Sequence, residues 1–90
     1  MAKILVVDDQ RNMRATLGMM LRGAGHEVIE APNGEKACGT VTGGGFDLVL
    51  TDLKMQFKDG LDVLRHVRQN APLTEVIVMT AYGTVETAVE

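Results

Sequence analysis

The sequence predicts a doubly wound α/β fold, in which a parallel β-sheet is covered by helices on both faces. Short apolar runs at residues 4–7, 48–50 and 76–79 are typical of strands that are buried on both faces. Between them lie segments whose apolar residues recur every three or four positions, as on the buried side of a helix. Strands and helices alternate with short connections, which is the pattern of right-handed βαβ units. With 90 residues, the chain is long enough for one domain.

The first half of the chain predicts two strand–helix pairs. Met13 begins the apolar face of the first helix, and glycines mark the end of that helix. Asn33 is a plausible N-cap for the second helix, which should be the weakest because it contains Gly39 and threonines. We expect strands at residues 3–7 and 27–31 and helices at residues 11–23 and 35–41.

The second half repeats the alternation. Asp59 and Gly60 open a helix that Pro72 terminates, and Tyr82 with Gly83 forms a turn. We expect strands at residues 46–51 and 75–79, a helix at residues 59–69, and a fourth helix that begins at Thr84.

Composition excludes several classes of function. A net charge of -3 and a pI near 5.3 argue against direct nucleic-acid binding, which needs a basic surface. Cys38 is the single cysteine, so no internal disulfide can form and a reducing cytoplasm is the expected location. No apolar stretch approaches the length of about 20 residues that a membrane span needs.

Oxygen-bearing side chains follow three of the predicted strands where each strand ends. Asp8 and Asp9 follow the first strand, Asp52 follows the third, and Thr80 follows the fourth. Because ligands bind at the carboxyl edge of an open parallel sheet, we expect these side chains to lie together. One Asp after a strand is often only a turn former or a helix cap, but two adjacent carboxylates repel each other and need a further reason.

Three carboxylates at one edge predict a site for a hard divalent cation such as Mg²⁺. In that interpretation Asp52 is a nucleophile toward phosphorus, and Asp8 and Asp9 hold the metal. The backbone carbonyl of Lys54, just after Asp52, is available as a further ligand. Thr80 can donate its hydroxyl to a phosphoryl oxygen once Asp52 is modified.

These motifs, as a set, resemble the receiver domain of bacterial two-component response regulators. The segments that carry the resemblance are Ile4-Leu5-Val6-Val7-Asp8-Asp9, Leu48-Val49-Leu50-Thr51-Asp52, Met55 with Asp59-Gly60, and Val78-Met79-Thr80-Ala81. They cover the whole chain in the family's order. The residues Thr80-Ala81-Tyr82-Gly83 are similar to receivers of regulators that work with sigma factor 54.

The resemblance implies a flavodoxin-like sheet of strand order 2-1-3-4. It implies that Asp52 accepts a phosphoryl group from a sensor histidine kinase with Mg²⁺, bound by Asp8 and Asp9, and that Thr80 is the switch hydroxyl. It also implies an output domain or partner protein, outside these residues, on which the receiver acts. The domain would then be a phosphoacceptor and not an enzyme in the usual sense.

Two departures from the family pattern are visible. The family usually has a proline after the residue matched by Met55, where this chain has Gln56, so we expect an altered and looser loop in which Phe57 is an exposed apolar contact. Receivers also continue for a fifth strand, which carries an essential Lys, and a fifth helix. We therefore expect residues 1–90 to be a single receiver domain that is incomplete at its C-terminus. The exposed edge of the fourth strand should lead the isolated chain to dimerise through that edge, to swap elements with a neighbour or to aggregate.

Two alternatives belong to other classes. An Mg²⁺-dependent phosphohydrolase with an aspartyl-phosphate intermediate typically has a second Asp two residues after the nucleophile, but Lys54 stands at that position. An interaction module that keeps the receiver fold without being phosphorylated is favoured by the missing Lys and by Gln56. Mg²⁺ binding distinguishes this module from a working receiver.

Overall fold

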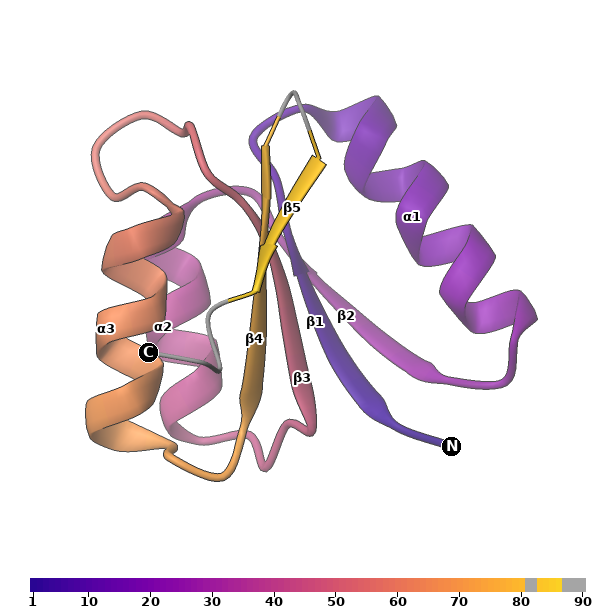
Figure 1. Ribbon diagram of the computed structural model, residues 1–90. Coiled ribbons are helices and arrows are strands. Elements are labelled where there is room, and N and C mark those ends of the chain that lie inside the picture. The colour runs from indigo at the N-terminus through magenta and orange to yellow at the C-terminus, as the bar shows by residue number, and fades with distance from the viewer. Residues whose placement is uncertain (81–82, 87–90) are drawn as a thin grey trace.

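The computed structural model describes residues 1–80 and the backbone of residues 83–86, and it contains one five-stranded sheet of order β2-β1-β3-β4-β5 (Figure 1). The first four strands pair in parallel, and they confirm the predicted order 2-1-3-4. The strands are β1 (Lys3–Val7), β2 (Glu27–Ala31), β3 (Leu48–Asp52), β4 (Glu75–Thr80) and β5 (Gly83–Glu86). The helices are α1 (Arg11–Gly23), α2 (Gly34–Thr42) and α3 (Gly60–Asn70).

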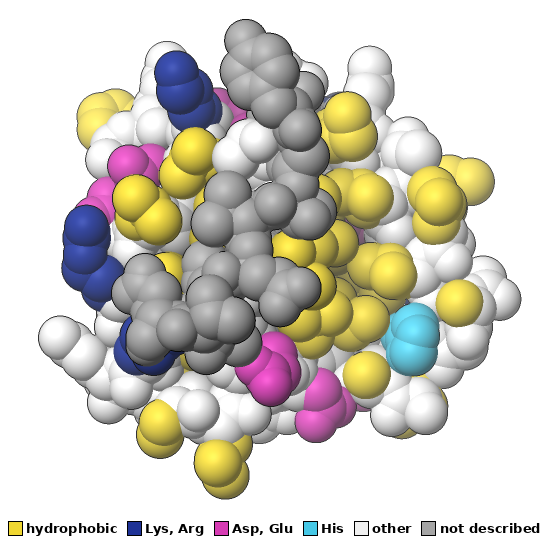
Figure 2. Space-filling view, in the orientation of Figure 1, with side chains coloured by type: hydrophobic (Ala, Val, Ile, Leu, Met, Phe, Trp, Pro, Cys, Tyr) yellow, Lys and Arg dark blue, Asp and Glu magenta, His cyan; other side chains and the backbone are white. Residues whose placement is uncertain are grey.

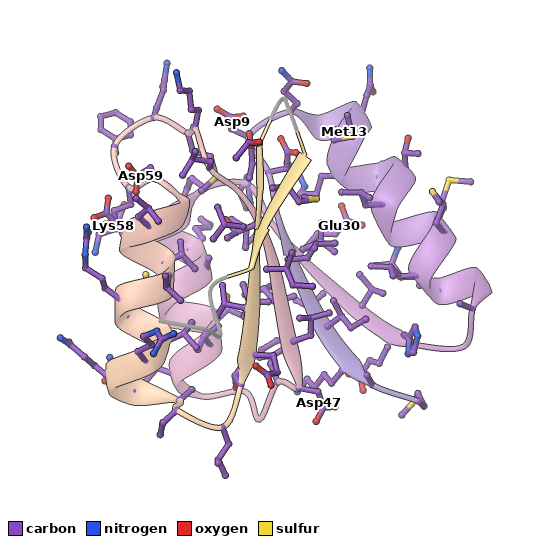
Figure 3. The ribbon with its side chains drawn as sticks, in the orientation of Figure 1. Asp9, Met13, Glu30, Asp47, Lys58 and Asp59 are labelled. Carbon is purple, nitrogen blue, oxygen red and sulfur yellow. The ribbon has the colours of Figure 1, made fainter. Side chains whose placement is uncertain are left out.

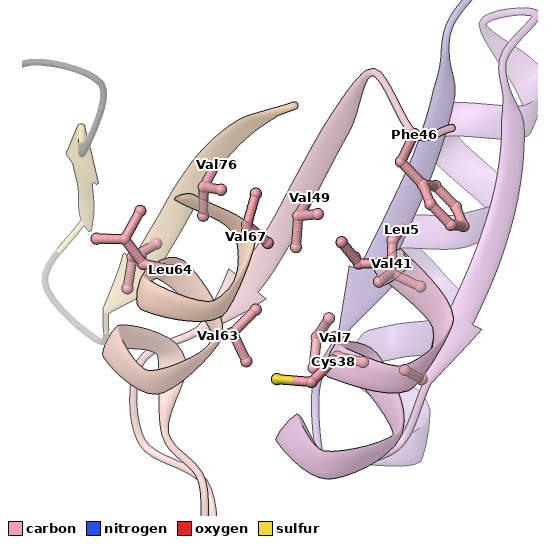
Figure 4. Close-up of a cluster of buried hydrophobic side chains, with 13 residues drawn as sticks. Leu5, Val7, Cys38, Val41, Phe46, Val49, Val63, Leu64, Val67 and Val76 are labelled. Atoms are coloured by element: carbon pink, nitrogen blue, oxygen red, sulfur yellow. The ribbon is translucent and has the colours of Figure 1, made fainter. Parts of the chain in front are cut away.

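The helices form two unequal layers. In Figure 1, α2 and α3 cover one face of the sheet and α1 lies on the other. The larger core lies under α2 and α3, where aliphatic side chains from both helices meet those of the central strands (Figure 4). Phe46 and Cys38 belong to this core, but its most deeply buried side chains are valines, leucines and alanines, which pack through many small contacts.

The face that carries α1 is only partly covered. A smaller cluster of Ile4, Val6 and Val28 packs against Leu17 and Leu21 of the helix. Alternate residues of β3 and β4 also point to this side, as the period of a strand requires, and these remain partly exposed: Leu48, Leu50, Ile77 and Met79. Figure 2 shows the hydrophobic side chains that gather on this side of the molecule.

Local hydrogen bonds explain where α2 and α3 begin. The side chain of Asn33 accepts a hydrogen bond from the backbone N–H of Lys36, which confirms the predicted N-cap. Asp59 and Asp62 form a capping box at the start of α3, in which each side chain accepts from the other residue's N–H. Both caps lie at the end of the sheet where β1 and β3 also finish, so they fix the loops around that end.

One predicted element is wrong. Residues 84–86 were expected to begin a helix, but Gly83–Glu86 is a strand that pairs antiparallel with β4, from Ile77 opposite Glu86 to Thr80 opposite Gly83. Thr84 and Val85 are β-branched and lie next to an open sheet edge, which favours a strand over the start of a helix. The edge of β4 is therefore covered over residues 77–80, and the predicted dimer through that edge loses its basis there. The predicted turn at Tyr82 and the rest of the expected helix lie outside the described residues.

Candidate metal and phosphoacceptor site

The register of the sheet brings Asp8 and Asp52 to one edge. Strands β1 and β3 are parallel neighbours with Val7 opposite Thr51, so the next residue of each strand reaches the same edge. One carboxylate oxygen from each of Asp8, Asp9 and Asp52 lies within 4.8 Å of the other two. The cluster predicted from the sequence is thus present, and Figure 3 shows Asp9 at this end of the sheet.

Asp8 is held rigidly, whereas Asp9 is exposed. Only 4% of the Asp8 surface is accessible to solvent. Its backbone N–H donates to the carbonyl of Ala31 at 3.2 Å, and its side-chain Oδ1 accepts from the N–H of Gln10 at 2.8 Å. The turn-forming role that such a residue often has is therefore real, and it leaves the Asp8 carboxylate in a fixed place beside Asp9 and Asp52.

Asp52 is placed by the loop that follows it. The N–H of Leu53 donates to the carbonyl of Met79 at 2.8 Å, and the N–H of Gly60 donates to the carbonyl of Leu53 at 2.8 Å. A Cβ atom at position 60 would lie 2.5 Å from the carbonyl oxygen of Asp52, so only glycine fits there. The first residue of α3 therefore packs directly against the backbone of Asp52.

Burial and neighbouring charges shift the pKa of Asp52. Burial raises the pKa of the Asp52 carboxyl above its ordinary value, and the neighbouring Asp8 and Asp9 carboxylates raise this pKa further. The backbone N–H groups of Leu53 and Lys54 partly offset that effect, because they donate to the ionised form. A cation placed among the three carboxylates would remove this repulsion.

The donor set suits Mg²⁺. The ion takes oxygen ligands at about 2.1 Å in an octahedron, so opposite ligands lie about 4.2 Å apart. Carboxylate oxygens that lie within 4.8 Å of one another are close to that spacing. The three carboxylates line a cavity, which leaves room for water ligands or a phosphoryl group. Lys54 and Thr80 line the same cavity.

The remaining predicted residues and several unpredicted ones share this cavity. Thr80 lies at the end of β4, next to the strand that ends on Asp52, as expected for a residue that could contact a group on Asp52. Met13, Gln10 and Met79 also line the cavity, although the sequence had indicated only a packing role for the methionines. Their one signal was proximity in sequence to Asp9 or Thr80. Ala81 and Tyr82 lie outside the described residues.

The loop without the family's proline is attached to the core at both of its ends. Met55 packs against the larger core, and Gly60 still bonds to Leu53. Phe57 is 96% exposed and has a φ of 68°, a left-handed backbone conformation that is uncommon for a bulky residue. The predicted exposure of Phe57 is confirmed.

Comparison with known proteins identifies the family to which this chain belongs. A family profile described as "Response regulator receiver domain" matches residues 4–90. The chain belongs to the family of response regulator receiver domains. This receiver is 44% identical over 87 residues to the transcriptional regulatory protein ZraR of Escherichia coli K12, covering 97% of the chain and 20% of the relative. It is 40% identical over 81 residues to the sporulation initiation phosphotransferase F of Bacillus subtilis, covering 90% of the chain and 65% of the relative. The chain therefore spans about a fifth of the length of the ZraR proteins that it matches.

Solved structures of other response regulators have the fold of this receiver. It matches the response regulator TrrA of Thermotoga maritima, solved with Mg²⁺ and BeF, with a TM-score of 0.86 and 39% identity over 91% of this chain and 71% of TrrA. TrrA has also been solved in complex with the histidine kinase ThkA, and that TrrA chain matches with a TM-score of 0.84 and 38% identity. Within residues 1–80 and 83–86, no helix is long and apolar enough to cross a membrane.

Proposed function

We propose that this receiver is the phosphoacceptor of a two-component system, with Asp52 as the residue that is phosphorylated. The observation that carries the proposal is the cluster of three carboxylates within 4.8 Å, in which Asp52 is the one placed by both β3 and the start of α3. The matches to TrrA solved with Mg²⁺ and BeF and with a histidine kinase support the assignment.

Each residue has a distinct role in this proposal. A carboxylate oxygen of Asp52 attacks phosphorus in a phosphohistidine, so a P–O bond forms while the P–N bond breaks and the imidazole leaves. Asp8 and Asp9, with Asp52 and the Lys54 carbonyl, would hold Mg²⁺, which neutralises charge between the carboxylates and the incoming phosphoryl group. The Thr80 hydroxyl would then donate to a phosphoryl oxygen on Asp52.

The partners follow from that chemistry. The donor is a sensor histidine kinase, and the phosphorylated receiver acts on an output domain or a partner protein. Transcriptional regulation is the proposed output, because the relatives ZraR and AtoC carry regulatory names. The cytoplasm is the proposed location, where the lone buried Cys38 stays reduced.

Phosphorylation with a small donor tests the proposal directly. The protein is incubated with acetyl phosphate and Mg²⁺, and the labelled residue is located by mass spectrometry after borohydride trapping. We expect labelling at Asp52 that is lost with EDTA and in Asp52→Asn. The control Asp47→Asn, at the opposite end of the sheet, should still be labelled (Figure 3). Labelling that survives in Asp52→Asn would overturn the assignment, and so would a wild-type protein that binds no Mg²⁺ in a calorimetric titration.

A further inference from the structure

Arg14 ties helix α1 to the turn that carries Asp8 and Asp9. Its Nη1 donates to the backbone carbonyl of Asp8 at 2.8 Å, and its backbone N–H donates to the carbonyl of Gln10 at 3.0 Å. The Arg14 side chain is only 16% exposed. One residue of α1 therefore holds the turn before the helix through both its side chain and its backbone.

Arg14 contacts the carbonyl oxygen of Asp8, whose position affects two of the three carboxylates. The Asp8 carbonyl belongs to the peptide group that joins Asp8 to Asp9, so rotation of this peptide would move both side chains. The N–H of Asp8 is anchored to Ala31, and its carboxylate accepts from Gln10. The bond from Arg14 adds the contact that fixes the Asp8–Asp9 peptide itself.

Glu30 holds the Arg14 guanidinium in place. It lies on β2 opposite Val6, and Figure 3 shows it between α1 and the sheet. Its Oε1 lies 3.3 Å from Arg14 Nε, and its Oε2 lies 3.3 Å from Arg22 Nη1. Because the guanidinium is planar, an anchor at Nε sets the direction in which Nη1 points.

Gly18 makes room for this arrangement. It lies four residues from both Arg14 and Arg22, on the same side of α1, and it is buried. A Cβ atom at position 18 would lie 3.1 Å from both Arg22 Nη1 and Glu30 Oε2. A residue with a side chain would thus push against the Glu30 carboxylate, which accounts for a glycine inside a helix where glycine is unfavourable.

We propose that Arg14, oriented by Glu30, is a positioning residue for the acidic site. It sets the Asp8–Asp9 peptide so that both carboxylates face Asp52. This inference rests on the proposed function in so far as the site binds Mg²⁺. Groups that orient metal ligands in this way commonly change metal affinity by about 10- to 100-fold when they are removed.

The sign of the effect separates positioning from simple electrostatics. Arg14 carries a positive charge near the site, so its removal should tighten the binding of a cation by Coulomb's law alone. Loss of a positioning contact should instead weaken binding. The two explanations therefore predict opposite changes in the dissociation constant for Mg²⁺.

Calorimetric titration with Mg²⁺ tests this in four variants. We expect the dissociation constant to rise about tenfold or more in Arg14→Gln. Arg14→Lys, whose single ammonium cannot reach Asp8 and Glu30 as a planar fork does, should show a smaller increase, and so should Glu30→Gln. Arg11→Gln is the matched control, because Arg11 is exposed on the same helix and carries the same charge. It should bind Mg²⁺ as tightly as the wild type or slightly more tightly.

A second readout needs no metal. In the metal-free protein, amide exchange followed by NMR should become faster at Asp9 and Gln10 in Arg14→Gln, with little change at the end of α1. A folded Arg14→Gln protein with unchanged or tighter Mg²⁺ binding and unchanged exchange would overturn the positioning role. If Arg14→Gln does not fold, Arg14→Lys and Glu30→Gln decide the question in the same way. A wild type without Mg²⁺ affinity would overturn the proposed function, and the exchange data would then decide the role of Arg14 separately.

Discussion

Gly60 lies so close to Asp52 that a Cβ atom at position 60 would be 2.5 Å from the Asp52 carbonyl oxygen. The first residue of α3 and the last residue of β3 therefore share a contact that permits no side chain. Because the atom in the way is backbone, it cannot move aside as a flexible side chain could.

Gly60→Ala should destabilise the protein and displace Asp52. We expect a loss of about 1–3 kcal/mol in the free energy of unfolding, the usual cost of overpacking, together with weaker Mg²⁺ binding. Urea denaturation and calorimetry measure the two effects. Gly39→Ala is the control, because nothing lies within 4 Å of a Cβ at that position in α2, and it should stabilise by about 0.5–1 kcal/mol. Equal stabilities for the two variants would contradict the close approach at Gly60.

Asp9→Asn should separate stability from metal binding. Removal of one carboxylate relieves repulsion of Asp52, so the metal-free protein should melt at a higher temperature. The same change removes a ligand and should weaken Mg²⁺ binding by about tenfold or more. Glu27→Gln, a neutralisation at the opposite end of the sheet, should leave Mg²⁺ binding unchanged. A lower melting temperature for metal-free Asp9→Asn would show that the carboxylates do not repel one another as described.

The stability of the metal-free protein should fall as pH rises past the ordinary pKa of an Asp near 3.8. The pKa of Asp52 is raised in the folded protein, so the folded state binds more protons than the unfolded state in this window, and deprotonation costs stability. With saturating Mg²⁺ the trend should reverse, because the metal binds the ionised carboxylates. Urea denaturation from pH 4 upward, with and without Mg²⁺, measures both trends. Both pH trends should be weaker in Asp52→Asn. A pH profile of Asp52→Asn that is identical to that of the wild type would assign the effect to another group.

Thr80→Val should uncouple the conformational response from phosphorylation. Valine keeps the shape and the β-propensity of threonine but removes the hydroxyl. Labelling of Asp52 by acetyl phosphate should continue, while the NMR shift changes that phosphorylation causes in β4 should diminish. Thr40→Val, which removes a half-buried hydroxyl of α2 that donates to the Lys36 carbonyl, serves as the control. A full response in Thr80→Val would reduce the residue to strand packing.

The sequence predicted the sheet and the acidic cluster because both depend on local patterns. The buried runs end on Asp8, Asp52 and Thr80, and parallel pairing brings such ends together without further information. Residues 84–86 form a strand because the edge of β4 is free to pair with them, and local sequence propensity does not reveal such an edge. The bond from Arg14 to Asp8 was equally hidden, because it requires Glu30 to arrive from another strand.

Helix α1 has no neighbouring helix among the described elements, and this couples its local opening to ligand binding at the acidic site. Among the described elements, α1 packs on β1 and β2 alone, whereas α2 and α3 pack on each other as well as on the sheet. An element with so little cover opens at a lower free energy than the global unfolding of its domain. Because the same helix holds the Asp8–Asp9 peptide, each opening of α1 would release two of the proposed metal ligands. The free energy of opening α1 should therefore rise with the logarithm of the Mg²⁺ concentration once this exceeds the dissociation constant, so that hydrogen exchange in the helix reports on Mg²⁺ binding at the acidic site.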